Sequence, residues 1–196
     1  MYDLVFLEQP HTYLLEGEPI PCVSALCRFL SREIYKDTPS WRMEEAAARG
    51  TAVHKATEDL DRTGGVCIDE DYAPYVQAYA AFLHDHDVIW EMTEKSMWHP
   101  EYRYAGTIDR YGTVDGVKTL VDLKTTYTVY KTLCGASLNL YRMILEARQK
   151  AVEKLLILHL KKDGTYKLVT IPIDNAVPMA LITLHNTLKK KRRKTK

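Results

Sequence analysis

Asp109, Asp122 and Lys124 are the residues whose types and spacing could do chemistry. Two strand-like runs meet at Asp115-Gly116, and Asp-Gly between β-branched residues is the preferred sequence of a two-residue type I′ hairpin. A turn centred there places Asp109 opposite Asp122, with Cβ atoms about 5 Å apart, where like charges destabilise one another. A divalent metal ion would neutralise such a pair. Lys124 shares a face with Asp122 because side chains alternate along a strand, and two carboxylates with one lysine could cut a phosphodiester.

The same residues could instead lie on the wet face of an ordinary antiparallel hairpin, with Asp122 and Lys124 as a surface ion pair. Their neighbours argue against that interpretation. Leu120, Val121 and Leu123 surround Asp122 with apolar side chains, and a carboxylate inside an apolar strand is costly unless it is paired or metal-bound. The flanking sequence therefore favours a site over a surface pair.

Two further segments offer metal ligands. His54 and Glu58 are four residues apart in a predicted helix and so share one face, where they could equally form a simple stabilising pair. Glu94 lies in the strand predicted before the hairpin and supplies either a third carboxylate or part of the polar face of an edge strand, with Glu91 as a rival. Imidazole and carboxylates together suit Mn²⁺, whereas Mg²⁺ prefers oxygen ligands and water.

Length and composition indicate one globular domain with a real core. The chain has 196 residues, of which 46% are hydrophobic and 10% aromatic. No apolar run reaches the roughly 18 residues needed to span a bilayer, and the start of the chain lacks the features of a secretory signal. The cysteines show no C-x-x-C spacing, so we expect buried thiols in a cytoplasmic protein rather than disulfides, zinc ligands or an iron–sulfur cluster.

The last eight residues, KKKRRKTK, hold seven of the 27 lysines and arginines and none of the 26 acidic residues. Residues 1–188 therefore carry a net charge of −6 and the tail one of +7. The tail is either a solvated helix end or a non-specific contact for phosphate backbones, whose binding would weaken steeply with salt. Its candidate DNA contacts are Lys189, Lys190, Lys191, Arg192 and Arg193. The competing prediction is a basic groove formed by Arg103, Arg110, Lys131 and Arg142.

Hydrophobic periodicity and turn residues predict the order of the elements. Short strands over 4–7, 12–15 and 20–23 precede helices over 25–35, 39–50, 52–62 and 72–86. A strand over 88–98 and the two hairpin strands precede a helix over 130–150, strands over 155–160 and 166–171, and a helix over 175–190. This order predicts an α/β fold: a central mixed β-sheet flanked by helices on both faces, with an N-terminal β-hairpin and helical region. We expect one domain over 1–188, divided into hairpin and helices (1–87) and sheet core (88–188), and a basic tail over 189–196.

Three motifs, taken in order, resemble the RecB-like branch of the PD-(D/E)XK nuclease superfamily. They are Gly50-Thr51-x-x-His54-x-x-x-Glu58, Gly106-x-x-Asp109 and Asp122-x-Lys124-Thr125. The opening is similar to that of phage-type exonucleases of this branch: His11-x-Tyr13, then Gly17 and Ile20-Pro21-x-Val23-Ser24. The likeness covers most of residues 10–145.

The resemblance implies a restriction-endonuclease-like core and a set of site residues. His54, Asp109 and Asp122 would be metal ligands together with the backbone carbonyl of Leu123, and Lys124 would be the catalytic lysine beside Asp109 and Asp122. Glu94 would be a further candidate ligand.

The branch also has a Gln-x-x-x-Tyr motif on the helix after the D-x-K strand, where it contacts the DNA strand. Tyr141 matches that motif, but Ser137 stands where Gln is expected. Asn139 is the nearest amide and lies on another helical face. Glu58 would support the DNA-binding side of the site.

These features predict a Mg²⁺- or Mn²⁺-dependent deoxyribonuclease in the cytoplasm of a bacterial or phage-infected cell. The expected activity is that of an exonuclease in phage or prophage DNA recombination, repair or processing. DNA would be its partner, and a recombination or annealing protein is a further candidate. A structure-specific endonuclease of the junction-resolvase type and a catalytically inactive DNA-binding module of the same fold are the alternatives.

Overall fold

The computed structural model describes residues 3–7 and 9–194, with side chains described as far as Lys189. The strands are β1 (Leu4–Leu7), β2 (Thr12–Leu15), β3 (Glu18–Ile20), β4 (Val88–Trp98), β5 (Ala105–Val114), β6 (Val117–Lys124), β7 (Lys154–Leu160) and β8 (Tyr166–Ile171). The helices are α1 (Val23–Leu26), α2 (Arg28–Ile34), α3 (Ser40–Thr63), α4 (Ala73–Asp85), α5 (Lys131–Glu146) and α6 (Ala176–Lys194).

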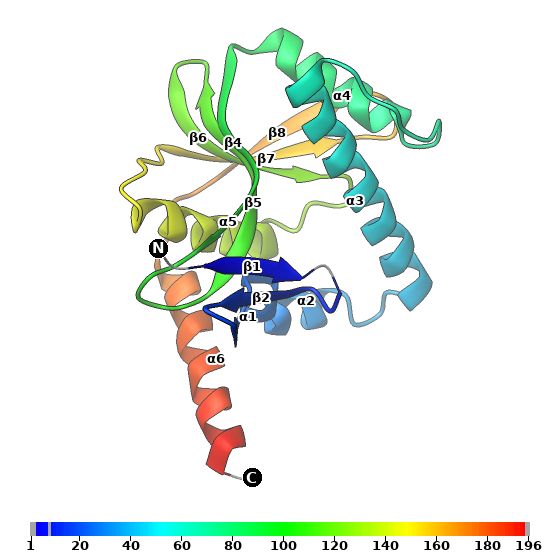
Figure 1. Ribbon diagram of the computed structural model, residues 1–196. Helices are drawn as coiled ribbons and strands as arrows, with labels where there is room; N and C mark the ends of the chain where they lie inside the picture. The colour runs from blue at the N-terminus through cyan, green and yellow to red at the C-terminus, as the bar shows by residue number, and fades with distance from the viewer. Residues whose placement is uncertain (1–2, 8, 195–196) are drawn as a thin grey trace.

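The core is a mixed five-stranded sheet in the order β4-β5-β6-β7-β8 (Figure 1). Only β6 and β7 run parallel, and α5 makes the crossover between them, as a parallel pair requires. Alternation along β6 sends Val121 and Leu123 into a cluster with α3 and α4, and sends Leu120 into a cluster with α5. The prediction of an α/β fold with a mixed sheet between helices is confirmed.

The hairpin register agrees with the prediction made from its turn. Asp115 and Gly116 both have positive φ, 50° and 79°, as a type I′ turn demands. Val114 pairs with Val117, and the ladder continues to Arg110 opposite Val121. The next position along would bring Asp109 opposite Asp122, and there the strands stop pairing.

Several predicted element boundaries are wrong. The two helices expected on either side of Gly50 are one continuous helix, α3. The backbone at Gly50 is not left-handed and a Cβ there would meet nothing within 4 Å, so this glycine neither ends a helix nor allows a close approach. The single helix expected over 25–35 is divided into α1 and α2, and Ser24 lies inside α1 rather than capping it. The third strand ends at Ile20, where it was expected to begin.

A second, three-stranded antiparallel sheet of β1, β2 and β3 packs against one end of the large sheet. Tyr13 and Leu15 of β2 are buried against Trp98 and Ala105. The predicted N-terminal hairpin is therefore present, and the third short strand expected after it pairs with β2, with different bounds. It covers the end of β4 and the start of β5, close to the segment that carries Asp109.

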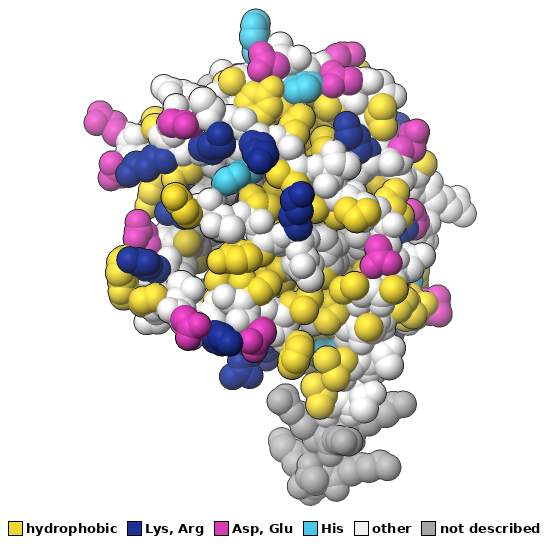
Figure 2. Space-filling model, turned by 180° about the vertical axis from the view of Figure 1, so that it is seen from behind, with side chains coloured by type: hydrophobic (Ala, Val, Ile, Leu, Met, Phe, Trp, Pro, Cys, Tyr) yellow, Lys and Arg dark blue, Asp and Glu magenta, His cyan; other side chains and the backbone are white. Residues whose placement is uncertain are grey.

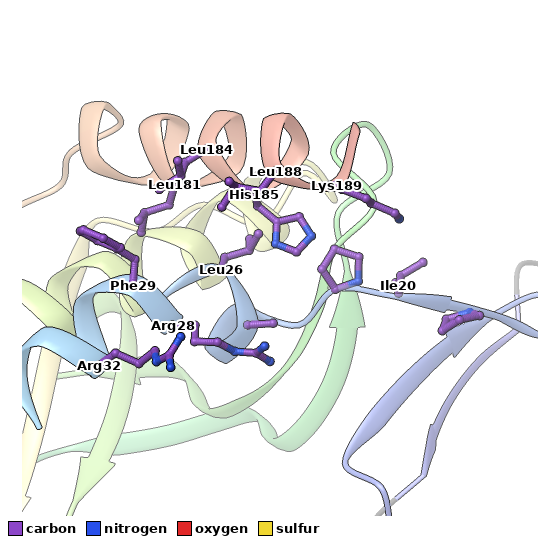
Figure 3. Close-up of a pocket in the computed structure, with 13 residues that line it drawn as sticks. Ile20, Leu26, Arg28, Phe29, Arg32, Leu181, Leu184, His185, Leu188 and Lys189 are labelled. Atoms are coloured by element: carbon purple, nitrogen blue, oxygen red, sulfur yellow. The ribbon is translucent and has the colours of Figure 1, made fainter. Parts of the chain in front are cut away.

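Helix α6 packs its first half on α1 and α5 through Leu181 and Ile182 and then leaves the body (Figure 1). In Figure 2 hydrophobic side chains follow this projection down to the grey tail. A groove of about 450 Å³ lies between α2 and α6. Figure 3 shows residues that line it, with Phe29 on the side of Leu181 and Leu184.

The four cysteines are free thiols. Cys27 and Cys134 are buried as expected, whereas Cys22 is half-buried and Cys67 is exposed. Among the described residues, no helix combines the length and apolar character needed to cross a membrane.

Candidate metal centre

Three side chains from three elements converge beside the large sheet. His54 of α3, Glu94 of β4 and Asp109 of β5 each offer one ligand atom, and these atoms lie within 4.8 Å of one another. Nδ1 of His54 is 3.0 Å from Oε1 of Glu94, and Nε2 is 3.8 Å from Oδ2 of Asp109. An imidazole and two carboxylates form a donor set that suits Mn²⁺ well and Mg²⁺ in part.

Leu123 joins β6 to the same cluster through its backbone. Its N–H donates a hydrogen bond to Oδ2 of Asp109 over 2.8 Å, and its carbonyl oxygen lies 3.3 Å from Nε2 of His54. The sequence placed this carbonyl among the ligands by resemblance, and the structure brings it next to His54 and Asp109. Three donors of the expected set therefore meet at one place.

Glu94 reaches the cluster through an irregularity in β4. Thr93 pairs with Arg110 and Lys95 with Ile108, so Glu94 stands at the level of Asp109, with φ at 43°. A left-handed glutamate inside a strand is strained, and such strain is often found at functional sites. Met92 packs in the cluster on the α5 side, whereas Glu94 turns toward His54 of α3, so these two residues do not share a face as strict alternation along a strand would require.

Arg110 anchors this arrangement and has no exposed surface. Its guanidinium donates to Oε1 of Glu94 over 3.0 Å, to Oδ2 of Asp61 over 2.8 Å and to the Thr57 hydroxyl over 3.0 Å. It also donates to the carbonyl oxygen of Asp109 over 2.7 Å. Arg110 thus fixes Glu94 relative to α3, a role that the sequence did not indicate. One signal of this buried role was available in the sequence: alternation along the strand puts Arg110 on the same face as Gly112 and Val114, a face that is otherwise uncharged.

Asp122 and Lys124 form an ion pair next to the cluster, in which the carboxylate is buried and the lysine side chain is partly exposed. Oδ2 of Asp122 lies 2.5 Å from Nζ of Lys124, and Nζ also donates to the carbonyl oxygen of Leu123 over 3.3 Å. The two side chains share a face of β6, as alternation predicted. Asp122 is not one of the three residues whose ligand atoms lie within 4.8 Å of one another; its nearest charged partner is the lysine.

The charges of the site shift the pKa values of its residues. Burial alone would lower the pKa of His54, but Asp109 and Glu94 outweigh it and raise the value to about 9. Burial also raises the pKa of Asp122, against the opposing effect of Lys124. For Lys124, burial would lower the pKa, and the carboxylates of Asp122 and Asp109 reverse that effect and raise it. Lys124 is accordingly a cation in the metal-free protein.

Tyr141 of α5 lies over the start of β5. A Cβ at Gly106 would stand 2.5 Å from Cε1 of Tyr141, so glycine is needed there for the ring to approach. Burial raises the pKa of Tyr141, and the nearby carboxylates of Asp109 and Asp122 raise it further. The expected place of Tyr141 is therefore consistent with the structure.

The other candidate residues, three on helices and Glu91 on β4, have different partners. The Ser137 hydroxyl donates to the carbonyl oxygen of Leu133 one turn earlier. Asn139 donates to the carbonyl oxygen of Pro172 and holds the connection into α6. Glu58 pairs with Lys55 on the outside of α3, and Glu91 pairs with Lys118 and Lys150. The structure brings none of these four to the cluster.

The predicted basic groove is wrong. Arg110 and Arg142 are buried, the first among acidic residues of α3 and β4 and the second against Asn139 and Glu146. They cannot line a groove together with the exposed Arg103 and Lys131. For the tail, Lys189 is exposed at the rim of the groove in Figure 3. The side chains of Lys190, Lys191, Arg192 and Arg193 lie outside the described residues.

No model of a known protein family matches the chain, and no curated protein matches it. The function must therefore be argued from the site itself.

Proposed function

We propose that the protein is a metal-dependent deoxyribonuclease of the RecB-like type, built on a restriction-endonuclease-like core and acting as an exonuclease. The observation that carries this proposal is that the Leu123 carbonyl oxygen joins the His54–Glu94–Asp109 cluster to the Asp122–Lys124 pair: it lies 3.3 Å from Nε2 of His54 and 3.3 Å from Nζ of Lys124. A metal-ligand set next to a lysine is the combination that phosphodiester hydrolysis needs.

The ligands of the proposed site are His54, Glu94, Asp109 and the carbonyl of Leu123, with Asp122 at the edge nearest the lysine. The cluster contains two carboxylates held close together, and their charges raise the pKa of His54 to about 9; this electrostatic environment favours a cation. Bound Mg²⁺ or Mn²⁺ would supply an activated water and would neutralise charge on the phosphate.

The chain's own residues would act on the phosphate and the water. Lys124, kept protonated by Asp122, would hold a phosphate oxygen and stabilise the negative charge that grows in the transition state. Asp122 would orient the ammonium group, which its 2.5 Å contact already fixes. Arg110 would keep Glu94 in the ligand set without touching the substrate.

The proposed substrate is DNA, in recombination, repair or processing in the cytoplasm of a bacterial or phage-infected cell. A recombination or annealing protein would be a further partner. A structure-specific endonuclease and an inactive DNA-binding module are the competing functions, and the same experiment separates them.

The test is incubation with end-labelled linear DNA and with closed circular DNA, in Mg²⁺, Mn²⁺ or EDTA. Metal-dependent loss of linear DNA with intact circles is the expected result. Cutting of circles would select an endonuclease, and survival of both substrates in both metals would contradict the nuclease proposal. Glu94→Gln should reduce the activity, whereas Glu91→Gln, an exposed acidic residue three positions earlier in the same strand, is the matched control and should not.

A further inference from the structure

A second groove, of about 610 Å³, lies between the N-terminal half of α3 and the loop that follows β6. Trp41, Arg42 and Arg49 line it from α3, and Tyr127 and Tyr130 line it from the loop. It is separate from the groove beside α6 shown in Figure 3, with which it shares no lining residue.

Aromatic side chains are unusually exposed along this groove. Trp41 is 59% exposed and Tyr127 is 100% exposed. Tyr130 packs edge-on against Tyr35, with ring centroids 5.5 Å apart, so the loop ring nearest the body is fixed while Tyr127 presents itself to solvent. Exposed aromatic faces of this kind are where unpaired bases stack, and every base has such a face.

The groove also carries positive charge that the protein does not neutralise. Within the described part of the chain, neither Arg42 nor Arg49 forms an ion pair. Arg42 lies over the Trp41 ring with Cζ 5.1 Å from its centroid. Arg49 lies over the Tyr75 ring at 5.7 Å, and its buried Nε has no hydrogen-bond partner among the described residues. One carboxylate, that of Glu45, lines the groove with them.

Aromatic faces and two unpaired arginines in one groove fit a chain of bases and phosphates better than they fit an apolar protein segment. An apolar helix would cover the rings but would leave both guanidinium groups without a partner, which is costly on desolvation. A nucleic-acid strand offers bases to the aromatic rings and phosphates to the guanidinium groups. The strand must be single, because the base faces are hidden within a duplex.

The groove adjoins the proposed catalytic lysine. Tyr127 follows Lys124 by three residues, which in extended chain is about 10 Å. The carbonyl of Thr126, between them, accepts a hydrogen bond from Nε2 of His159 over 2.7 Å, so the loop is tied to β7. A strand lying along this loop would lead toward the Asp122–Lys124 pair.

We infer that the groove between α3 and the β6–α5 loop binds single-stranded nucleic acid, with bases stacked on Trp41 and Tyr127 and phosphates against Arg42 and Arg49. This inference rests on the proposed nuclease function, which gives the bound strand its use: an unpaired end enters here and reaches Lys124. Binding in the groove needs no cleavage, so the two ideas are tested separately.

The test measures binding by full-length protein in EDTA, where metal-dependent cleavage is absent. The probes are fluorescein-labelled oligo-dT, oligo-rU of the same length, and a blunt DNA hairpin, followed by anisotropy. The variants are Trp41→Ala and Tyr127→Ala, with Tyr127→Phe to keep the ring. Phe29→Ala is the matched control, because Phe29 is an aromatic residue 67% exposed in the other groove.

Trp41→Ala and Tyr127→Ala should each weaken oligo-dT binding about tenfold, while Tyr127→Phe and Phe29→Ala bind as the wild type does. Hairpin binding should change little. Arg42→Ala should lower the salt dependence of oligo-dT binding by about 0.7 in the log–log slope, as expected when one phosphate of a single strand is no longer neutralised. Equal affinity for oligo-rU would mean that the groove does not read the sugar, and weaker affinity would identify DNA as its ligand; both support the inference.

Unchanged oligo-dT affinity in both aromatic variants, or no oligo-dT binding by the wild type, would overturn the inference. An equal loss for the hairpin would also overturn it, since a duplex cannot offer its base faces. Trp41 and Tyr127 are exposed, so unchanged circular dichroism and thermal unfolding should accompany the loss of binding. If the wild type fails to cut DNA in Mg²⁺ or Mn²⁺ but these variants still lose oligo-dT binding, the nuclease proposal fails and the groove stands.

Discussion

The backbone N–H of Leu123 donates to Oδ2 of Asp109 over 2.8 Å, at the point where β5 and β6 cease to pair. A side-chain carboxylate thus replaces the main-chain carbonyl as acceptor, and the strands separate around it. The carbonyl of the same leucine lies 3.3 Å from Nε2 of His54. The opening between the strands and the gathering of the proposed ligands are therefore one feature.

Asp109 has a structural and a metal-binding role that two substitutions can separate. Asp109→Asn keeps an oxygen that accepts the Leu123 N–H but removes the charge. Mn²⁺ affinity should fall at least about tenfold, while stability should fall only by the lost attraction to protonated His54. Asp109→Ala should also lower the free energy of unfolding, by about 1–3 kcal/mol, because it leaves that N–H without its partner. Calorimetric titration with Mn²⁺ and urea unfolding give the two readouts. Equal Mn²⁺ affinity for Asp109→Asn and wild type would remove Asp109 from the ligand set.

The pKa of His54 predicts how pH acts on the metal-free and metal-bound protein. Its value is raised to about 9 from 6.5, so the protonated imidazole stabilises the metal-free fold fully below pH 6.5, and this contribution is lost as pH rises through about 9. A metal ion needs the neutral imidazole. We therefore expect Mn²⁺ binding at pH 7.5 to release a proton and apparent affinity to increase with pH up to about 9.

Glu94→Gln should lower the pKa of His54, because it removes one of the two carboxylates that raise it, and should reduce proton release at pH 7.5. NMR titration of the His54 ring protons and calorimetry in buffers of different ionisation enthalpy would measure both effects. Glu91→Gln serves as control. A His54 that titrates near 6.5 in the metal-free wild type would contradict the geometry of the cluster.

Lys124 should matter for both cleavage and stability. Lys124→Ala should reduce cleavage by more than about a hundredfold, because it removes the cation that would act on the phosphate in the transition state. It also leaves the buried Asp122 carboxylate without its ion-pair partner, which should cost on the order of 2 kcal/mol, less than for a fully buried pair because the Lys124 side chain is 30% exposed.

The double variant Asp122→Asn, Lys124→Met separates these effects, because it removes both charges. Its free energy of unfolding should recover toward the wild-type value while cleavage stays absent. Measurements of turnover and urea unfolding on the same samples would establish this. Cleavage by Lys124→Ala within about tenfold of wild type would mean that another group acts on the phosphate.

Gly106 and Tyr141 should behave as a coupled pair. Gly106→Ala places a Cβ 2.5 Å from Cε1 of Tyr141 and should destabilise the fold by about 1–3 kcal/mol. In the Tyr141→Ala background the ring is absent, and the same substitution should cost clearly less. Gly112→Ala is the contrasting case, because its Cβ would meet the backbone carbonyl oxygen of Ile89, which no side-chain deletion relieves. Equal costs for Gly106→Ala in both backgrounds would contradict the packing of the ring on this glycine.

Local chemistry explains which features the sequence could predict. The Asp115-Gly116 turn determines the hairpin register because few residues accept two successive positive φ values. The predicted positions of Asp109, Asp122 and Lys124 along the two strands follow from that register. Hydrophobic periodicity located the helix expected over 72–86 for a similarly local reason, and its Tyr75, Tyr79 and Phe82 are buried in the core. The family resemblance itself remains a prediction.

The features that were missed depend on distant contacts. Glu94 was a candidate ligand from the sequence, but the geometry that brings it into the cluster was not predicted: its own left-handed backbone and a register shift between Trp90 and Met92 leave no pattern in the strand. Arg110 was expected in an exposed groove, as arginines are mostly at the surface. Its burial is tolerable because it pairs with Asp61, from a helix far away in the sequence, and with Glu94. Helix α3 continues through Gly50 because a single helical glycine costs only about 1 kcal/mol.

The basic tail gives the last prediction. Deleting residues 189–196 removes seven positive charges from a body of net charge −6, so non-specific DNA affinity should fall. The log–log salt slope should flatten by about 0.9 for each duplex phosphate that the tail no longer neutralises. Lys189 is exposed where α6 projects from the body, and the proposed ligands belong to other elements, so turnover at saturating DNA should be retained.

Binding at several salt concentrations, for full-length and truncated protein, is the measurement. A truncation that stops after the first half of the tail, at Arg192, should lie between the two, because four of the seven charges remain. Identical slopes for all three proteins would mean that the tail does not touch DNA, and binding would then rest on the aromatic groove beside α3 alone.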